Sequence, residues 1–325
     1  MRQNTYNNNI IVLRFIAILI VVFGHSIIIY DPEWGFYSTN IHSNVLVTIK
    51  HIINLIQMPL FFSISGYLFF YSLSKYKNRF KIIFKKFRRL IIPFIIVGLF
   101  YFLPMKYILN IEPFVSNSVS YNVFHNVILG FNNGHLWYLT TLFIIFIINC
   151  FGYFNKRSKI LDIIYLLIFA ILNLIAIKYT LHLYNIFSYL VYFYIGCLIN
   201  KYNLQSNKPI LFIIFPITLL ILLNKITFIN LYMRIFKLII TILIIIFLYN
   251  INFSKLSNNR IIKLVSNDSF GLYLFHSPLI YISFINFPNI HPLIMILFNF
   301  FFLGLVALLI TELIKRSKLK FIIGL

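Results

Sequence analysis

The chain has 325 residues, of which 61% are hydrophobic and only 10% are charged. A soluble domain needs about a quarter of its residues charged, so this composition excludes a water-soluble enzyme, a disordered chain and a disulfide scaffold. Twenty-eight Lys and Arg face six Asp and Glu, which gives a formal net charge of +22. In a membrane protein such an excess can come from loops on one side of the bilayer and does not require a nucleic acid.

Long apolar runs predict ten transmembrane helices, because about 20 apolar residues cross the core of a bilayer. No series of segments of about 10 residues alternates in the way expected of a membrane β-barrel. The predicted spans are residues 10–30, 52–73, 90–109, 135–152, 160–177, 186–200, 210–224, 235–250, 269–287 and 292–314. We therefore expect an all-α polytopic membrane protein, with residues 1–325 forming a single transmembrane domain.

The positions of Lys and Arg predict that both termini are cytosolic, because cytosolic loops carry the excess of these residues. With ten alternating spans, 21 of the 28 fall in predicted cytosolic segments, six fall in outer loops or outer span ends, and Arg14 lies inside a span. This asymmetry accounts for the basic charge, so no nucleic-acid partner is expected. The expected location is the inner or plasma membrane, with membrane lipids as neighbours.

The first span carries an arginine and a histidine, Arg14 and His25. Eleven residues at 100° each end only about 20° beyond three turns, so the two side chains share a helix face and lie about 16 Å apart along the axis. Ionisable residues inside a membrane are candidates for function. Two structural alternatives stay open: Arg14 could reach the headgroups, and His25 could simply bond a neighbour at the helix end.

Three further segments place polar residues in or beside spans. Ser65 interrupts an aromatic run in the second span, where small residues can also serve close helix packing. His135 and Trp137 begin the fourth span, a level at which Trp often only anchors a helix. In the ninth span, Asp268 is expected to cap the start of the helix, which places His276 about 12 Å deep.

A basic run, KYKNRFKIIFKKFRRLIIP, occupies residues 75–93. Its mixture of cations and Phe is typical of an interfacial segment held by anionic lipid. The same charge could attract an anionic cytosolic ligand, and Arg88 and Arg89 are then best placed to bind phosphate. The sequence shows no His/Cys metal spacing, no phosphate-binding glycine loop and no dinucleotide fingerprint, so no metal is expected.

Five short motifs, in order, resemble those of the acyltransferase-3 family of integral membrane acyltransferases. Arg14 and His25 match its R-x10-H pattern, and the other matches are FFSISGYLF (61–69), FRRLIIP (87–93), GHLWYL (134–139) and SFGLYLFH (269–276). The resemblance extends over nearly the whole chain. Because the outer loops are short, we do not expect the additional soluble domain that some members carry.

The resemblance implies transfer of an acyl group, usually acetyl, from acyl-CoA to a hydroxyl of a carbohydrate or lipid-linked glycan of the bacterial cell surface. Acetyl-CoA or another acyl-CoA is then the co-substrate. A neutral histidine suits the base that an alcohol needs, which indicates His25, while Arg14, Arg88 and Arg89 would bind the CoA phosphates. Contacts to the oxyanion or the acceptor would come from residues that the sequence does not distinguish: Ser65, His135, Trp137, Tyr273 and His276.

A transporter or flippase of lipid-linked saccharides is the main alternative, because it too would use many helices and buried charges. It predicts paired discontinuous helices marked by Gly or Pro, and no clear inverted pair is visible. A sensor with an inactive site is a second alternative. A glycosyltransferase would need outer carboxylates, of which the sequence offers Asp31, Glu33 and Glu112. The acceptor, the acyl group and the oligomeric state stay open.

Overall fold

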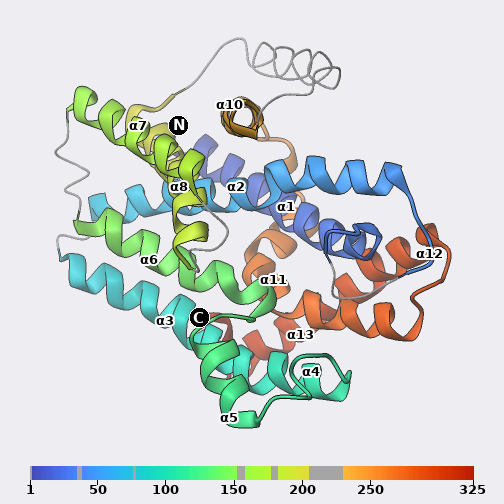
Figure 1. Ribbon diagram of the computed structural model, residues 1–325. Helices are drawn as coiled ribbons and strands as arrows, with labels where there is room; N and C mark the ends of the chain where they lie inside the picture. Colours follow the sequence, from blue (N-terminus) through green and yellow to red (C-terminus); the bar gives the residue numbers. More distant parts are fainter. Residues whose placement is uncertain (1, 35–38, 76–77, 152–157, 177–181, 205–229) are drawn as a thin grey trace. The chain divides into compact units, whose positions relative to one another are not determined.

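The computed structural model describes residues 2–34, 39–75, 78–151, 158–176, 182–204 and 230–325. These residues form helices joined by turns and short connecting segments, and no strand occurs among them (Figure 1). The all-α class that the composition predicts is therefore confirmed for this part of the chain.

Nine α-helices of the described residues have more than ten residues: α1 (Arg2–Ser26), α2 (Asn44–Lys75), α3 (Arg79–Val97), α6 (Trp137–Phe151), α7 (Lys159–Ile175), α8 (His182–Tyr202), α10 (Asn230–Asn250), α11 (Arg260–Asn286) and α13 (Gly304–Arg316). Shorter elements are α4 (Leu103–Ile108), α5 (Val119–Tyr121), α12 (Pro292–Leu297) and the 3-10 turns η1 (Ile28–Tyr30), η4 (Gly134–Leu136), η6 (Leu256–Asn258) and η8 (Lys320–Ile323). Three π-helical segments complete the set: η2 (Gly98–Phe102), η3 (Asn122–Ile128) and η7 (Phe298–Leu303). Such segments are rare and often accompany functional sites.

Seven helical runs of the described residues are long and apolar enough to cross a membrane: Asn8–Ser26, Asn44–Leu73, Arg79–Ile108, Gly134–Phe151, Leu183–Tyr202, Leu231–Asn250 and Pro292–Arg316. They correspond to seven of the ten predicted spans. The predicted spans 160–177 and 269–287 overlap α7 (Lys159–Ile175) and α11 (Arg260–Asn286), which are not among the seven, and 210–224 lies outside the described residues. The chain is a polytopic membrane protein, while the number ten and the orientation of the termini stay predictions.

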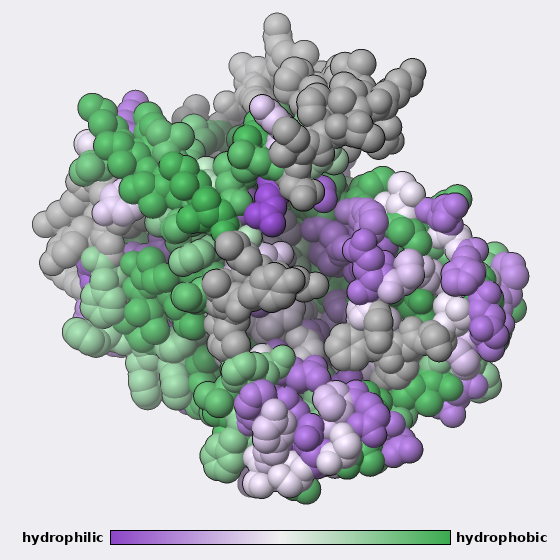
Figure 2. Space-filling model, viewed as in Figure 1, coloured by the Kyte–Doolittle hydropathy of each residue, from purple (hydrophilic) through white to green (hydrophobic). Residues whose placement is uncertain are grey.

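The outward surface of α7 shows why these helices suit a lipid environment. Ile160, Ile163 and Leu167 are each more than half exposed. Figure 2 shows hydrophobic side chains over the surface that α7 occupies in Figure 1. An apolar surface of this kind is typical of a membrane or interaction face, and here it follows the length of a helix.

The chain is organised as two compact units, each assembled from three separated segments. Unit 1 comprises Met1–Ala17, Leu55–Ile82 and Ile144–Lys263, and unit 2 comprises Ile18–Asn54, Ile83–Phe143 and Leu264–Leu325. Several helices, α1 among them, contribute residues to both units. The prediction of a single domain is not tested by this division, and each unit is described separately below.

In unit 1, α2 and α8 cross at two glycines. A Cβ atom at Gly66 would lie 1.9 Å from the carbonyl oxygen of Phe193, and one at Gly196 would lie 1.8 Å from that of Ser63. The Cys197 thiol, on α8, is 3.1 Å from the carbonyl oxygen of Gly66. Small residues thus allow two backbones to touch, which is the packing alternative that the sequence left open for this segment.

The expectation that Asp268 caps its helix is wrong. The helix α11 begins at Arg260, and the Asn259 side chain accepts hydrogen bonds from the backbone N–H groups of Ile261 and Ile262, at 2.8 and 3.2 Å. Asp268 lies in the helix interior, buried, and accepts a 2.7 Å hydrogen bond from the Lys315 ammonium. The ion pair between Asp268 and Lys315 therefore connects α11 to α13 in unit 2, and Asp268 does not cap a helix.

Two span boundaries also differ from prediction. The helix that contains the predicted span 90–109 begins at Arg79, so most of the basic run is its first half and not a separate interfacial segment. The helix that contains 52–73 begins at Asn44. Lys, Arg and Ile have moderate to good helix propensity and no Gly or Pro occurs between 79 and 92, so the helix continues past the apolar stretch.

Candidate functional site

Three histidines from distant parts of the sequence meet in unit 2. His25 is in the last turn of α1, His135 is in η4 directly before α6, and His276 is in α11. The ring centroid of His276 lies 4.9 Å from that of His25 and 5.6 Å from that of His135. We call these three residues the histidine cluster.

The hydrogen bonds of the cluster fix where the protons lie. His276 Nδ1 is 3.0 Å from the carbonyl oxygen of Leu272 and 2.9 Å from that of Tyr273. Carbonyl oxygens only accept, so Nδ1 carries the proton and Nε2 of a neutral His276 is an acceptor. This assignment follows from the bonding partners, in the usual way for histidine.

His25 completes the arrangement. Its Nδ1 is 2.9 Å from the carbonyl oxygen of Val21 and 3.3 Å from Nε2 of His276. Both neighbours are acceptors, so His25 Nδ1 carries a proton that the two share. In a neutral imidazole the other nitrogen, His25 Nε2, then holds the lone pair, which is the form required of a general base.

The three histidine rings differ in how much of their surface is exposed. His276 has no exposed surface and His135 is 5% exposed, whereas His25 is partly exposed. Within the histidine cluster, His25 is thus the ring that a substrate can reach. His276 is one of the two acceptors, with the Val21 carbonyl, that set the tautomer of His25.

His135 ties η4 to α11. Its Nε2 donates to the carbonyl oxygen of Leu274 at 3.0 Å, and the Tyr273 hydroxyl donates to the backbone carbonyl of His135. His135 Nδ1 is buried and has no hydrogen-bond partner. The turn depends on Gly134, which has φ of 54° and whose Cβ would lie 2.7 Å from the Phe102 ring, a conformation and a space that favour glycine.

A buried lysine lies beside the cluster. The Lys106 ammonium, on α4, lies 4.3 Å from the ring centroid of Tyr281, 5.2 Å from that of Phe102 and 5.6 Å from that of Phe114. Aromatic faces attract a cation at this range. The ring centroid of Phe102 is also 6.2 Å from that of His135. The signal for Lys106 in the sequence is a lysine within an apolar run.

Two of the predicted donor-binding arginines, Arg88 and Arg89, are exposed on α3, on the surface of unit 2. The backbone of Arg89 packs against Gly324, whose φ is 72°. Exposed arginines can meet phosphate from solution or from lipid, and their role stays a prediction.

Arg14 and Ser65 belong to unit 1 and are both partly buried. Arg14 stands on the same continuous helix α1 as His25, which is the spacing that the sequence predicts. Trp137 begins α6, partly buried, two residues after His135. The roles of these three residues in a site stay predictions.

One group of residues in unit 2 could hold a cation, although no such site was expected. Asp31, Glu33 and His51 offer three ligand atoms that lie within 4.8 Å of one another. Oxygen and imidazole ligands suit several divalent metals. Asp31 and Glu33 are two residues apart, whereas His51 follows 18 residues after Glu33, so the spacing of the carboxylates alone did not indicate a third ligand.

A known protein family matches the part of the chain that contains every candidate site residue. The family model of the acyltransferase-3 proteins, described as an acyltransferase domain, matches residues 7–315. No curated protein and no solved structure matches the chain.

Proposed function

The chain belongs to the acyltransferase-3 family and is a membrane acyltransferase, and on this basis we propose that it transfers an acyl group from acyl-CoA to a hydroxyl of a carbohydrate or lipid-linked glycan. Acetyl-CoA is the expected donor, and the inner or plasma membrane of a bacterium is the expected location. The observation that carries the proposal is the hydrogen-bonded pair His25–His276, which presents a lone pair on His25 Nε2.

The proposed reaction needs one base. His25 Nε2 removes the proton of the acceptor hydroxyl as its oxygen attacks the thioester carbonyl carbon. The tetrahedral intermediate then breaks its C–S bond, and the imidazolium returns the proton to the leaving CoA thiolate. General base catalysis of this kind contributes typically 10²–10⁴-fold.

His276 supports the charged state of this base. When His25 becomes an imidazolium, its Nδ1–H group still points at the Val21 carbonyl oxygen and His276 Nε2. Hydrogen bonds from a charged donor are about twice as strong as neutral ones. His276 is therefore a positioning residue in this proposal: it orients His25 and stabilises the proton that His25 accepts.

The hydrogen bonds also narrow the candidates for the oxyanion. The His276 Nδ1–H group and the Tyr273 hydroxyl already donate to backbone carbonyls, so these two residues act in our proposal as supports for the cluster. His135 Nε2 likewise donates to the carbonyl oxygen of Leu274, so Ser65 and Trp137 stay as candidate donors. The buried Lys106 ammonium lies beside Phe102, whose ring is 6.2 Å from that of His135, and a cation there suits negative charge developing in a dry site.

The donor side of the proposal rests on cations. Arg14, Arg88 and Arg89 would bind the phosphates of acyl-CoA through charge-assisted hydrogen bonds. No metal takes part in the proposed reaction.

The whole proposal is tested by mass spectrometry of surface glycans from cells with and without the protein. We expect a glycan fraction that is heavier by one acyl group only where the protein is present, because the transfer adds that group covalently. Glycan masses that do not change, together with movement of lipid-linked glycan across vesicles without acyl-CoA, would replace the transferase by a flippase.

Replacing His276 by leucine should reduce kcat by about 10–100-fold with little change in KM, because one hydrogen bond to a charged group is worth about 1.5–3 kcal/mol. His276→Gln should recover part of the rate, since its amide oxygen can accept from His25. In a His25→Ala background the second change to leucine should have little further effect. An additive loss in the double variant would show that His276 acts independently of His25.

A further inference from the structure

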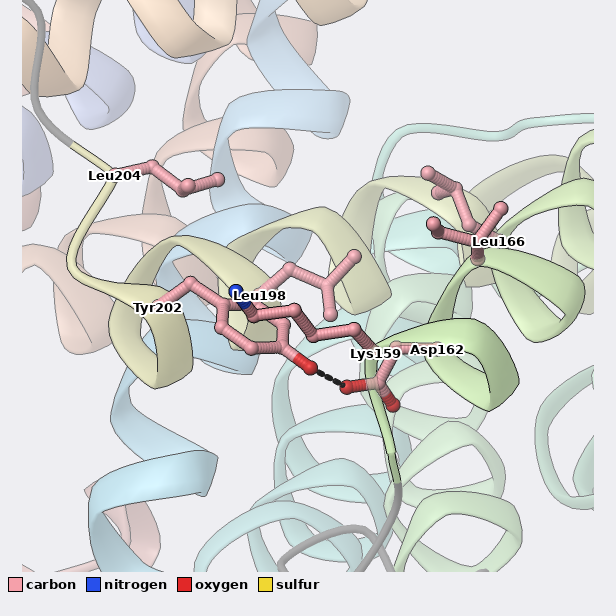
Figure 3. A pocket seen from close by; sticks show the side chains of 7 residues that line it. Lys159, Asp162, Leu166, Leu198, Tyr202 and Leu204 are labelled. Carbon is pink, nitrogen blue, oxygen red and sulfur yellow. Dashed lines mark hydrogen bonds between the residues drawn. The ribbon is translucent and has the colours of Figure 1, made fainter.

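Unit 1 contains a pocket between α7 and α8 of about 380 Å³, which plays no part in the proposed chemistry. It is lined by Lys159, Asp162, Ile163, Leu166, Leu198, Tyr202 and Leu204. Figure 3 shows the Lys159 side chain reaching from α7 toward the Tyr202 ring, with its ammonium 6.0 Å from the ring centroid. We propose that this pocket binds an anionic phospholipid, with the lipid phosphate at Lys159 and an acyl chain along the aliphatic wall.

The two helix ends beside the pocket, the start of α7 and the end of α8, are both capped by hydrogen bonds. Ser158 caps α7 through a 3.3 Å hydrogen bond from the Leu161 backbone N–H group. At the end of α8, Asn203 has φ of 50° and the Leu204 N–H group reaches back to the carbonyl oxygen of Ile199 at 3.2 Å. This bond pattern is that of a left-handed helix cap, and it turns the chain so that Leu204 lines the pocket.

The polar groups of the wall are already partnered, with Lys159 the cation that faces the pocket. Asp162 accepts from the Lys201 ammonium at 2.6 Å, from the Tyr202 hydroxyl at 2.5 Å and from the Tyr194 hydroxyl at 2.8 Å. Two ammonium groups and one carboxylate leave one positive charge at this end of the pocket. An anionic group on the ligand therefore complements it.

The order of residues along α7 matches the polarity of a lipid. Lys159, Ile163 and Leu166 stand at spacings of four and three residues, so they share one face of the helix. Leu166 is about 10 Å from Lys159 along the axis. Charge at the helix end and aliphatic side chains further in correspond to a headgroup at the membrane surface and a chain below it.

The position and the charge of the pocket favour a phospholipid over the CoA donor as its ligand. The outward face of α7 is exposed and aliphatic at Ile160, Ile164 and Leu167, so the pocket opens beside the surface that faces lipid. CoA carries several phosphates and would need several cations, whereas one charged lysine suits a single phosphodiester. The site is independent of the histidine cluster and of the proposed transfer reaction.

The test is native mass spectrometry of the full-length chain purified in neutral detergent and titrated separately with phosphatidylglycerol and phosphatidylcholine of equal chain length. We expect the wild type to retain phosphatidylglycerol about fivefold more than phosphatidylcholine, since one lysine near a lipid surface is worth that factor. Lys159→Gln should abolish this preference and Lys159→Arg should keep it. Leu166→Trp should reduce binding of both lipids by filling the pocket.

The exposed lysine Lys263 supplies the matched control, and Lys263→Gln should retain the preference. Equal retention of the two lipids by the wild type, or an undiminished preference in Lys159→Gln, would contradict the proposal. Release of bound lipid by acetyl-CoA would assign the pocket to the donor, and release by inorganic phosphate alone would show a simple anion site.

Discussion

Acyl transfer by a His25→Ala variant should be about 10²–10⁴-fold slower than by the wild type, while the protein still inserts and folds. Alanine removes Nε2, the nitrogen to which the hydrogen bonds of Val21 and His276 assign the lone pair. The loss has this size because general base catalysis contributes about that factor. The measurement is the initial rate of CoA thiol release in proteoliposomes that contain the acceptor.

A matched histidine variant separates chemistry from folding. His291 is exposed at the start of α12, where its side chain accepts from the Leu293 backbone N–H group. Asparagine is a preferred cap residue, so His291→Asn should keep both the helix and the rate. A His25→Ala protein with wild-type yield, wild-type melting temperature and undiminished rate would remove His25 from the reaction.

The all-α membrane class can be predicted from the sequence because a chain with so few charged residues cannot form the surface of a water-soluble protein. Helix boundaries follow less well. Because Arg260 and Lys263 are charged, the predicted ninth span is shorter than the helix α11 that contains it. Asp268 was predicted to cap this helix, but Asn259 is the residue that caps it. Hydropathy marks the part of a helix that suits lipid, whereas the hydrogen-bonded helix continues wherever propensity and capping allow.

The candidate site, too, can be predicted from the sequence only in part. His25, His135 and His276 were selected as polar residues at or inside apolar spans, which local reasoning can find. That they form one cluster, and that His276 shares the Nδ1 proton of His25 with the Val21 carbonyl, depends on a contact between residues 251 positions apart. Spacing along one helix gave the shared face of Arg14 and His25, but no local pattern reports which helices pack together.

Substituting alanine for either glycine at the crossing of α2 and α8 should destabilise unit 1. A methyl group at Gly66 would overlap the carbonyl oxygen of Phe193, and one at Gly196 would overlap that of Ser63. Both obstacles are backbone atoms of a helix, so a side-chain rotation cannot relieve them. The helices must separate, and overpacking of this kind costs about 1–3 kcal/mol or more.

The expected result is a melting temperature lower by roughly 3–10 °C for Gly66→Ala and for Gly196→Ala, measured by fluorescence-detected size-exclusion chromatography after heating in detergent. The double variant should be less than additive, because helices already separated by one methyl group accommodate the second more easily. Loss of the same size at unrelated glycines would show that the effect is general to glycine and not specific to this crossing.

Gly304 on α13 provides that comparison. Its Cβ would lie 3.7 Å from the Val22 side chain, an ordinary contact distance. Alanine has the higher helix propensity by about 1 kcal/mol, so Gly304→Ala should leave the melting temperature unchanged or raise it. The same chemical change then destabilises the protein at Gly66 and Gly196 but not at Gly304, and the difference is decided by whether the new methyl group overlaps a backbone oxygen or meets a side chain at an ordinary contact distance.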